Sequence, residues 1–526
     1  MFRLHSFKLG GHPQLGSLEM KFAPLESDSK APFSSVVIGM NGTGKSFLLS
    51  TLANLFNQIY QIQQSEQKRE RISYTFHIKY SIGSSSYDIV SSKMLRHLHK
   101  DIDRKDVLDI YYFKNLSGDE KLFNDKLPFE PIVKSNQIDV TELELPSQVT
   151  ASSTQLNDRF KFKKSNEGDF YQYMGVKRSA QVASTKSFER NTAGYLYKAV
   201  QKESFNRNIE QVLVNFLDFK KHLNIKYSTK YKKVFLTGNV TASDLHEFFI
   251  NYKARGRNSQ PWGKWKYDKL IKEDPDRIDR IIKFLNHIAS DERILMKKAR
   301  SPASWFVVDL INNNIDSEGL QLIEDLDDLD VLVMNSIEVI KSDKTLGLSQ
   351  TSAGESQIVM SLLGILANIK NNSLVLIEEP EISLHPNWQM KYIHLLKQMF
   401  QEEYGCHFII ASHSHFIVSD LEKESSSIIS IKQAEGKLIA ESLSEPETFG
   451  WSAEQVLFDI FNVATSRNYY LNNLISEILE LMANENSSND EIKKKIRYLR
   501  SLDLNLNIED PMTEIVEALF KKLDNA

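Results

Sequence analysis

The sequence predicts an α/β fold, with a parallel-sheet core, an antiparallel β subdomain, a compact helical insertion and a helical C-terminal tail. Three apolar segments have the β-branched composition of buried parallel strands, at residues 33–38, 374–377 and 406–412. The first continues through a glycine-rich stretch into residues 47–55, which have helical spacing. A chain of 526 residues, 41% of them hydrophobic, can bury a large core, and we expect about two to four structural units.

Two short segments precede the first apolar strand. Residues 2–7 and 18–22 alternate between apolar and polar side chains, like the two strands of a hairpin. We expect them to begin the antiparallel β subdomain.

The glycine-rich stretch reads Gly39-Met40-Asn41-Gly42-Thr43-Gly44-Lys45-Ser46, which has the spacing of a P-loop. In such a loop the backbone N–H groups turn inward around phosphates, a lysine neutralises phosphate charge, and a hydroxyl is a ligand for Mg²⁺. The strand before it and the helix after it are the context that a P-loop requires. The residues predicted to hold the phosphates of ATP are Gly39, Asn41, Gly42, Thr43, Gly44, Lys45 and Ser46, and Ser46 is also a predicted Mg²⁺ ligand.

A long segment separates this stretch from the second apolar strand, so a large insertion divides the core into two lobes. Residues 189–339 are rich in Lys, Asp, Asn and Leu and have no sustained heptad pattern, which favours a compact helical insertion over a coiled coil. We expect four regions: an N-terminal lobe at 1–165, a mainly helical insertion at 166–340, a C-terminal lobe at 341–445 and a helical C-terminal region at 446–526.

Two stretches of the insertion are basic and contain aromatic residues. Such stretches can bind nucleic acid by stacking and phosphate neutralisation, but a solvated helix face with buried tryptophans explains the same residues and is the interpretation that we favour. The first consists of Lys220, Lys221, His222, Lys226, Lys230, Lys232 and Lys233. The second consists of Lys253, Arg255, Arg257, Trp262, Lys264, Trp265, Lys266, Tyr267 and Lys269.

A helix is expected to begin within Leu348-Ser349-Gln350-Thr351-Ser352-Ala353-Gly354-Glu355. Ser352 can cap it, Glu355 completes a capping box, and residues 358–366 supply an apolar face. The N-terminus of a helix is a natural phosphate site, although a capped structural helix has the same pattern.

The second apolar strand ends in two acids, Glu378 and Glu379, followed by Pro380. Adjacent residues at a strand end point in different directions, so the two carboxylates can have different roles. The third strand ends at Ser412 and is followed by His413, with His415 as an alternative site histidine. No Cys or His cluster has metal-ligand spacing, so Mg²⁺ is the only ion implied.

The order of these four motifs resembles that of the ATP-binding heads of the ABC superfamily, in the branch that contains the SMC and RecF proteins and the defence ATPases. The resemblance implies that residues 348–355 are the signature and that Glu378 and Glu379 follow the Walker B strand. It further implies that Glu378 lies on the Mg²⁺ side, that Glu379 is the general base, and that His413 senses the γ-phosphate. Glu378 departs from the aspartate that is usual at its position.

The same resemblance implies a second copy of the chain. Ser352, Gly354 and Glu355 would meet the γ-phosphate that the P-loop of the opposite protomer holds, which predicts a head-to-tail homodimer or a higher oligomer. A glutamine usually joins Mg²⁺ to the adjoining domain. Gln155 follows a predicted strand and is the first candidate for this metal and nucleotide contact; Gln148 is the second, and a solvated loop residue is the alternative.

The composition excludes several classes of protein. A net charge of −4 gives no global field for nucleic acid. The single cysteine, Cys406, lies in a predicted core strand, which argues against a disulfide framework and for a reducing compartment. No apolar run approaches the roughly 20 residues of a membrane span, so we expect a cytoplasmic protein with no membrane partner.

Weaker motifs resemble the ATPase subunits of the Septu anti-phage systems, the PtuA family, including forms carried with retrons. The resemblance implies a partner HNH nuclease of the PtuB family and, in retron forms, a reverse transcriptase with its DNA–RNA hybrid. The matching segments are residues 151–160, residues 171–175, residues 449–452 and residues 459–463.

Two other functions stay open. A DNA-repair or chromosome-maintenance head of the RecF or SMC type would bind DNA without a linked nuclease. An OLD-type nuclease would carry a Toprim domain after the head. Ala434-Glu435-Gly436-Lys437 superficially resembles the start of such a domain, but no Asp-x-Asp follows it at a strand end.

Overall fold

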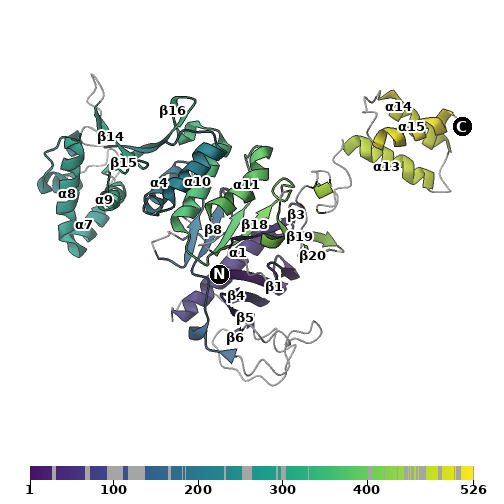
Figure 1. The fold of residues 1–526 in the computed structure, drawn as a ribbon, viewed down its shortest axis with the longest axis horizontal. Coiled ribbons are helices and arrows are strands. Elements are labelled where there is room, and N and C mark those ends of the chain that lie inside the picture. The colour runs from purple at the N-terminus through teal and green to yellow at the C-terminus, as the bar shows by residue number, and fades with distance from the viewer. Residues whose placement is uncertain are drawn as a thin grey trace. The chain divides into compact units, whose positions relative to one another are not determined.

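The computed structural model (Figure 1) forms two compact units, Met1–Trp451 and Ser452–Ala526, and each is described separately. It describes residues 1–25, 31–64, 72–91, 110–116, 137–163, 168–179, 182–183, 185–229, 233–250, 264–291, 294–297, 304–329, 331–400, 405–419, 421–434, 436–443, 448, 451, 455–457, 460, 469–483, 489–502, 504 and 511–524.

A seven-stranded sheet forms the centre of the first unit, in the order β20-β19-β3-β18-β17-β8-β9. All neighbours pair in parallel except β19 and β20, which form an antiparallel hairpin. This confirms the α/β class and the three apolar strands. The strands are β3 (Phe33–Gly39), β8 (Val149–Ser153), β9 (Tyr171–Met174), β17 (Leu374–Glu378), β18 (His407–Ser412), β19 (Ser426–Ala434) and β20 (Lys437–Leu443).

A six-stranded antiparallel sheet, in the order β2-β1-β4-β5-β6-β7, forms the predicted β subdomain. Helix α1 (Lys45–Gln63) shares one hydrophobic core with both sheets, because Phe2, Leu52 and Leu376 belong to the same buried cluster. The strands are β1 (Phe2–His12), β2 (Gly16–Lys21), β4 (Thr75–Ile82), β5 (Ser85–Ser91), β6 (Ile110–Leu116) and β7 (Gln137–Ile138).

The insertion carries the expected helices, and it also contains a five-stranded antiparallel sheet that the sequence did not predict, in the order β13-β14-β12-β15-β16. Its helices are α4 (Thr185–Ala199), α5 (Phe205–Ile209), the π-helix η3 (Glu210–Phe216), α6 (Ala242–Ile250), α7 (Lys264–Glu273), α8 (Pro275–Ser290) and α9 (Ser317–Asp328). The strands of this sheet are β12 (Leu223–Thr229), β13 (Leu295–Lys297), β14 (Ser304–Asp309), β15 (Leu332–Lys341) and β16 (Lys344–Gly347). The short strands β10 (Lys177–Ser179) and β11 (Val182–Ala183) pair with each other.

Among its described residues, the first unit also contains α10 (Ala353–Asn368) and α11 (Pro386–Met399). Helix α10 is buried along most of its length and packs against α4, so it joins the insertion to the core (Figure 1). Short 3₁₀ turns connect elements at η2 (Val140–Glu142), η4 (Lys233–Leu236), η5 (Leu348–Gln350) and η7 (Lys423–Ser425).

The second unit contains α13 (Tyr469–Ala483), α14 (Asn489–Ser501) and α15 (Pro511–Asp524). They pack through a small apolar cluster that includes Ile478, Ile496 and Leu519. Most of the two C-terminal segments that carry the Septu resemblance, residues 449–450, 452, 459 and 461–463, lies outside the described residues. Within the described residues, no helix is both long and apolar enough to cross a membrane.

Candidate functional site

The carboxyl ends of four parallel strands meet at one edge of the central sheet. Ser412 at the end of β18 is in register with Ile38 of β3, and Glu378 at the end of β17 is in register with Ser153 at the end of β8. In open parallel sheets, ligands bind outside the carboxyl ends of the strands. The glycine-rich loop, the acid pair, His413 and Gln155 all follow these strand ends, so the topology gathers residues that are far apart in the sequence.

The loop between β3 and α1 has the backbone that its glycines permit. Gly42 has φ 82° and Gly44, the N-cap of α1, has φ 86°, values that favour glycine. A Cβ at Gly39 would lie 2.5 Å from the carbonyl oxygen of Ile431 in β19, so a side chain at Gly39 would collide with backbone. The strand, the loop with two glycines at positive φ, and the helix therefore have the geometry that a P-loop needs.

Lys45 is buried within this loop. Its Nζ donates to the carbonyl oxygens of Gly39 (2.8 Å) and Met40 (3.2 Å) and lies 3.2 Å from Nδ1 of His413. Burial lowers the pKa of Lys45 to about 8, while the carboxylates of Glu379 and Glu381 act in the opposite direction. An ammonium group held by neutral acceptors at a helix N-terminus can neutralise a phosphate.

Glu379 accepts hydrogen bonds on both of its oxygens. Nε2 of His413 lies 3.2 Å from its Oε1, and the side-chain amide of Gln155 donates to its Oε2 at 2.5 Å. Since Nδ1 of His413 accepts from Lys45, the network places a proton on Nε2. The hydrogen bond from His413 is the main reason that the pKa of Glu379 is lowered, so this carboxylate is an ionised acceptor near neutral pH.

The backbone also holds Glu379 in place. Its N–H donates to the carbonyl oxygen of Ala411 (2.8 Å), and its φ is 44°, in the left-handed region where a non-glycine residue is strained. Such strain is concentrated at functional sites, where the surrounding structure fixes the conformation.

Glu378 points to a different place from its neighbour. It is 3% exposed, and its Oε2 is buried without a hydrogen-bond partner. Burial raises its pKa, and the hydroxyls of Ser46 and Ser153 oppose that rise. A buried carboxylate oxygen beside a serine hydroxyl is the oxygen donor set that Mg²⁺ prefers, so Ser46 and Glu378 fit this ion. The Gln155 amide contacts Glu379 instead.

Glu381 is a site residue that sequence reasoning did not single out. Its Oε1 accepts from the backbone N–H of His413 at 2.5 Å, and burial raises its pKa. Its other oxygen is buried without a partner. Glu381 therefore fixes the turn that presents His413. Its position two residues after Glu379 was the available signal.

The predicted signature forms the start of α10. The hydroxyl of Ser352 accepts from the N–H of Glu355 (3.2 Å), and Glu355 accepts from the N–H of Ser352 (2.8 Å), which is the expected capping box. Lys341 pairs with Glu355 at 2.5 Å. A Cβ at Gly354 would lie 2.5 Å from the carbonyl oxygen of Ser383, so the loop after Glu379 touches the start of α10. Ser352 itself is exposed.

The structure also places the second candidates of the sequence analysis. Gln148 precedes β8, at the end of that strand opposite Gln155, and its amide donates to the carbonyl oxygen of Asp169 at 3.4 Å. The ring of His415 packs on Phe416, whereas His413 contacts Lys45 and Glu379.

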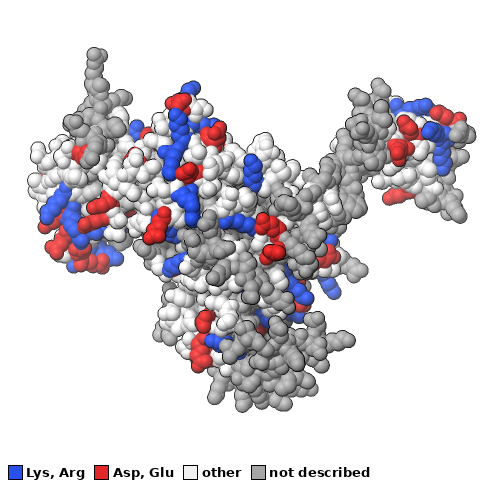
Figure 2. Space-filling view, in the orientation of Figure 1, with Lys and Arg blue, Asp and Glu red and all other residues white. Residues whose placement is uncertain are grey.

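Five lysines of the two basic stretches pair with acids, and Figure 2 shows positive and negative side chains interspersed over α7 and α8 at the left. Trp265 is 57% exposed, whereas Tyr267 is buried. The ion pairs are Lys220 with Asp343, Lys221 with Glu210, Lys226 with Glu338, Lys266 with Asp328 and Lys269 with Glu273. Residues Lys230, Lys232, Lys253, Arg255, Arg257 and Trp262 lie outside the described residues, and nucleic-acid binding stays a prediction.

Comparisons with solved structures find the SMC head domain from Thermotoga maritima at 11% identity and a TM-score of 0.33, covering 84% of this chain and 99% of that one. An SMC head domain with an extended coiled coil, bound to the C-terminal domain of ScpA derived from Pyrococcus furiosus, has 14% identity and a TM-score of 0.31, covering 84% and 97%. An SMC head bound to the C-terminal winged-helix domain of ScpA has 11% identity and a TM-score of 0.29, covering 84% and 98%. These overall structural similarities are weak, and the family assignment does not depend on them.

No curated protein matches the sequence significantly. The family model described as "AAA ATPase domain" matches residues 19–418, which span the glycine-rich loop, the insertion, the start of α10, the acid pair and His413. The chain therefore belongs to the AAA ATPase domain family and is an ATPase by descent.

Proposed function

We propose that this chain is the ATP-hydrolysing regulatory subunit of a prokaryotic anti-phage defence complex, in which it dimerises around ATP and controls a separate HNH nuclease. The observation that carries the ATPase chemistry is the cluster of Lys45, His413, Glu379 and Gln155 at the carboxyl edge of the sheet.

The chemistry of hydrolysis follows from these contacts. Lys45 and the N–H groups of the loop hold the β- and γ-phosphates, and the Glu379 carboxylate orients the attacking water and takes its proton. His413 and Gln155 hold the two oxygens of that carboxylate in place. Ser46 and Glu378 would hold Mg²⁺, which neutralises phosphate charge when bound. Gln155 remains a proposed metal contact that would have to turn away from Glu379.

The start of α10 supports the proposed second copy. Ser352 and Glu355 bond to each other, and Glu355 pairs with Lys341 at the end of β15, while Ser352 stays exposed. An exposed, capped helix N-terminus can accept the γ-phosphate of another protomer. The two heads would then join when ATP binds and separate after hydrolysis. A partner that binds the joined and separated states with different affinity would respond to the ATP cycle.

The defence role rests on the Septu resemblance. Of its segments, residues 151–160 and 171–174 form β8, the loop with Gln155, and β9, beside the proposed site. The proposed partners are the PtuB-type HNH nuclease and, in a retron form, a reverse transcriptase with its DNA–RNA hybrid. The insertion and the C-terminal helices are the surfaces available to them.

The test is to isolate the tagged chain from its native operon and identify its partners by mass spectrometry. A stoichiometric HNH nuclease, with no DNA or RNA cleavage by the purified chain alone, is the expected result. Nuclease activity that survives purification and is lost on mutation of this chain would contradict the proposal. DNA-loading proteins as the partners would favour the RecF-type alternative.

A further inference from the structure

A second cavity lies away from the ATPase site, where the insertion meets the core. Its volume is about 270 Å³, just below the roughly 300–1,000 Å³ of typical small-molecule sites. Four segments line it: the start of β8 with β9, the end of α4, the middle of α9 and the end of α10. Helices α4 and α9 belong to the insertion, so an occupant would contact both parts of the unit (Figure 1).

The cavity lies at the opposite end of α10 from Ser352. Gln148 precedes β8, whereas the site residue Gln155 follows it, and Asn368 is the last residue of α10, which begins at Ala353. At about 1.5 Å per residue, the 16 residues of α10 separate the cavity from the signature by roughly 24 Å. A ligand in the cavity would therefore occupy a site separate from the P-loop.

The charged side chains of the lining are mainly basic. Lys198, Lys202 and Lys370 face one acid, Glu324. Among the described residues, none of the three lysines forms an ion pair with a carboxylate, and Nζ of Lys202 donates to the carbonyl oxygen of Ile369 at 2.8 Å. The pKa of Lys202 is lowered to about 8, mainly by burial, and the positive charge of Lys370 acts in the same direction. Ammonium groups that repel each other in a partly buried cavity favour an anion between them.

Amide side chains also line the cavity. Gln148 and Gln172 are each 1% exposed and Asn368 is 8% exposed, so these polar side chains are buried in the core. Side-chain amides both donate and accept, which suits the hydroxyls or the base of a ligand. The Gln172 amide is oriented by donation to the carbonyl oxygen of Asp169 at 3.1 Å.

From the cavity, its lysines and its buried amides, we propose that this is a second binding site for a small phosphorylated organic compound of at most about nucleoside monophosphate size. The phosphate contacts the lysines, and the organic part contacts the amides. Because the insertion and the core both supply contacts, a ligand in the cavity stabilises their present arrangement. If ATP binds this arrangement more tightly than others, binding at either site strengthens binding at the other. The binding site itself does not depend on the proposed defence function.

The test is hydrogen-exchange mass spectrometry on the full chain with AMP or ribose 5-phosphate, and with adenosine and ribose as uncharged counterparts. Either phosphorylated probe should slow exchange around residues 147–149 and 367–373, and neither counterpart should do so. The Lys45→Ala variant should retain this protection, which separates the cavity from the P-loop.

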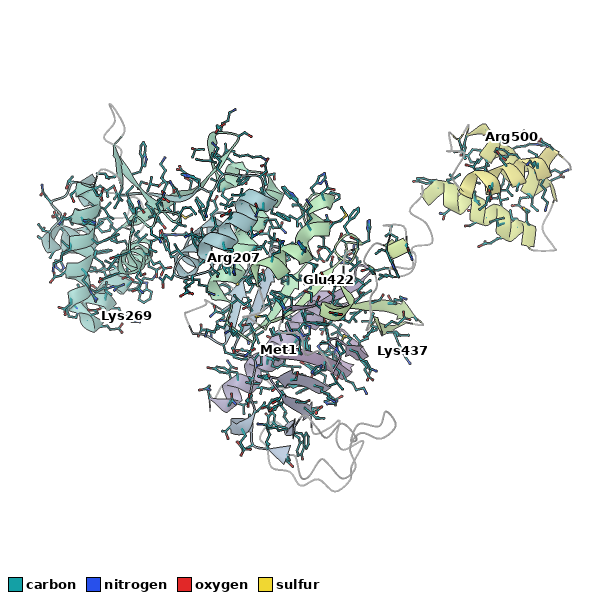
Figure 3. All side chains as sticks on the ribbon, viewed as in Figure 1. Met1, Arg207, Lys269, Glu422, Lys437 and Arg500 are labelled. Carbon is teal, nitrogen blue, oxygen red and sulfur yellow. The ribbon has the colours of Figure 1, made fainter. Side chains whose placement is uncertain are left out.

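Two variants sharpen the result. Lys370→Glu, at an exposed lining lysine, should weaken the binding of the effective probe by about tenfold or more, and Lys202→Ala should act in the same direction. Lys269→Ala is the matched control, since this lysine lies on the surface of α7 outside the cavity (Figure 3). Absence of protection with both phosphorylated probes, equal protection by their uncharged counterparts, or unchanged binding in Lys370→Glu would overturn the proposal.

Discussion

The two ends of the central sheet differ in how their polar residues are brought together. At the carboxyl end, the ATPase residues follow strand ends in short motifs, and their contacts form one network around Glu379. At the other end, the cavity takes single lysines and amides from four separate segments. A site built from contiguous loops can therefore be recognised from a sequence motif, whereas a site built from side chains of distant segments cannot.

The largest effect is expected from Lys45→Ala, which should abolish ATP binding because the phosphates lose their main cationic partner. Equilibrium dialysis with labelled ATP measures this loss, and Lys269→Ala, at an exposed lysine of the insertion, is the control that should bind normally. ATP binding within about twofold of wild type in Lys45→Ala would remove the glycine-rich loop from the nucleotide site.

A composite site predicts complementation. A Ser352→Arg chain and a Lys45→Ala chain should each be inactive, and their mixture should regain activity, because one mixed interface pairs an intact loop with an intact helix start. With random exchange, about a quarter of all sites would be intact. Phosphate release measures the recovery. A mixture as inactive as its parents, with exchange verified by mass spectrometry, would argue against sharing between protomers.

Glu381 tests whether the histidine turn matters for turnover. Glu381→Ala should lower kcat by about tenfold with KM nearly unchanged, because the N–H of His413 loses its acceptor and the network around Glu379 loosens. Glu381→Gln keeps an acceptor and should recover part of the rate. Equal losses in both variants, or a loss in KM alone, would exclude this positioning role.

A further prediction concerns pH. Lys45 has a pKa lowered to about 8 by burial, so it is protonated below that pH and neutral above it. Bound phosphate favours the protonated form, so ATP affinity should fall by about tenfold per pH unit above about pH 8. The carboxylates of Glu379 and Glu381 and the ring of His413 face this ammonium. Affinity that stays constant from pH 7 to 9.5, with folding verified, would contradict this titration.

The predictability of the molecule follows the same division. Gly42, Lys45, Glu379 and His413 belong to short segments whose local pattern specifies strand, turn and helix, so the sequence located them and the sheet brought them together. Gln155 could be predicted from the sequence because it follows the end of a strand.

Other features depend on partners far away in the chain. Strand β12 pairs with β15 more than 100 residues later, so its place in a sheet depends on a distant partner; its alternating apolar and polar residues were the available local signal. The acceptor role of Glu381 needs the backbone of His413, which only the fold supplies. Ala434 and Lys437 form the end of the β19–β20 hairpin, and the superficial likeness of this segment to the start of a Toprim domain reflects only that local turn.

The central claim is that this chain hydrolyses ATP with Glu379 as the general base, and one variant tests it directly. Glu379→Gln keeps the size of the side chain and one acceptor oxygen for the two groups that donate to Glu379, but it cannot take a proton from water. Single-turnover phosphate release, measured with ATP binding on the same samples, should show wild-type affinity with hydrolysis slowed by about 10² to 10⁴. Hydrolysis at the wild-type rate would contradict the account.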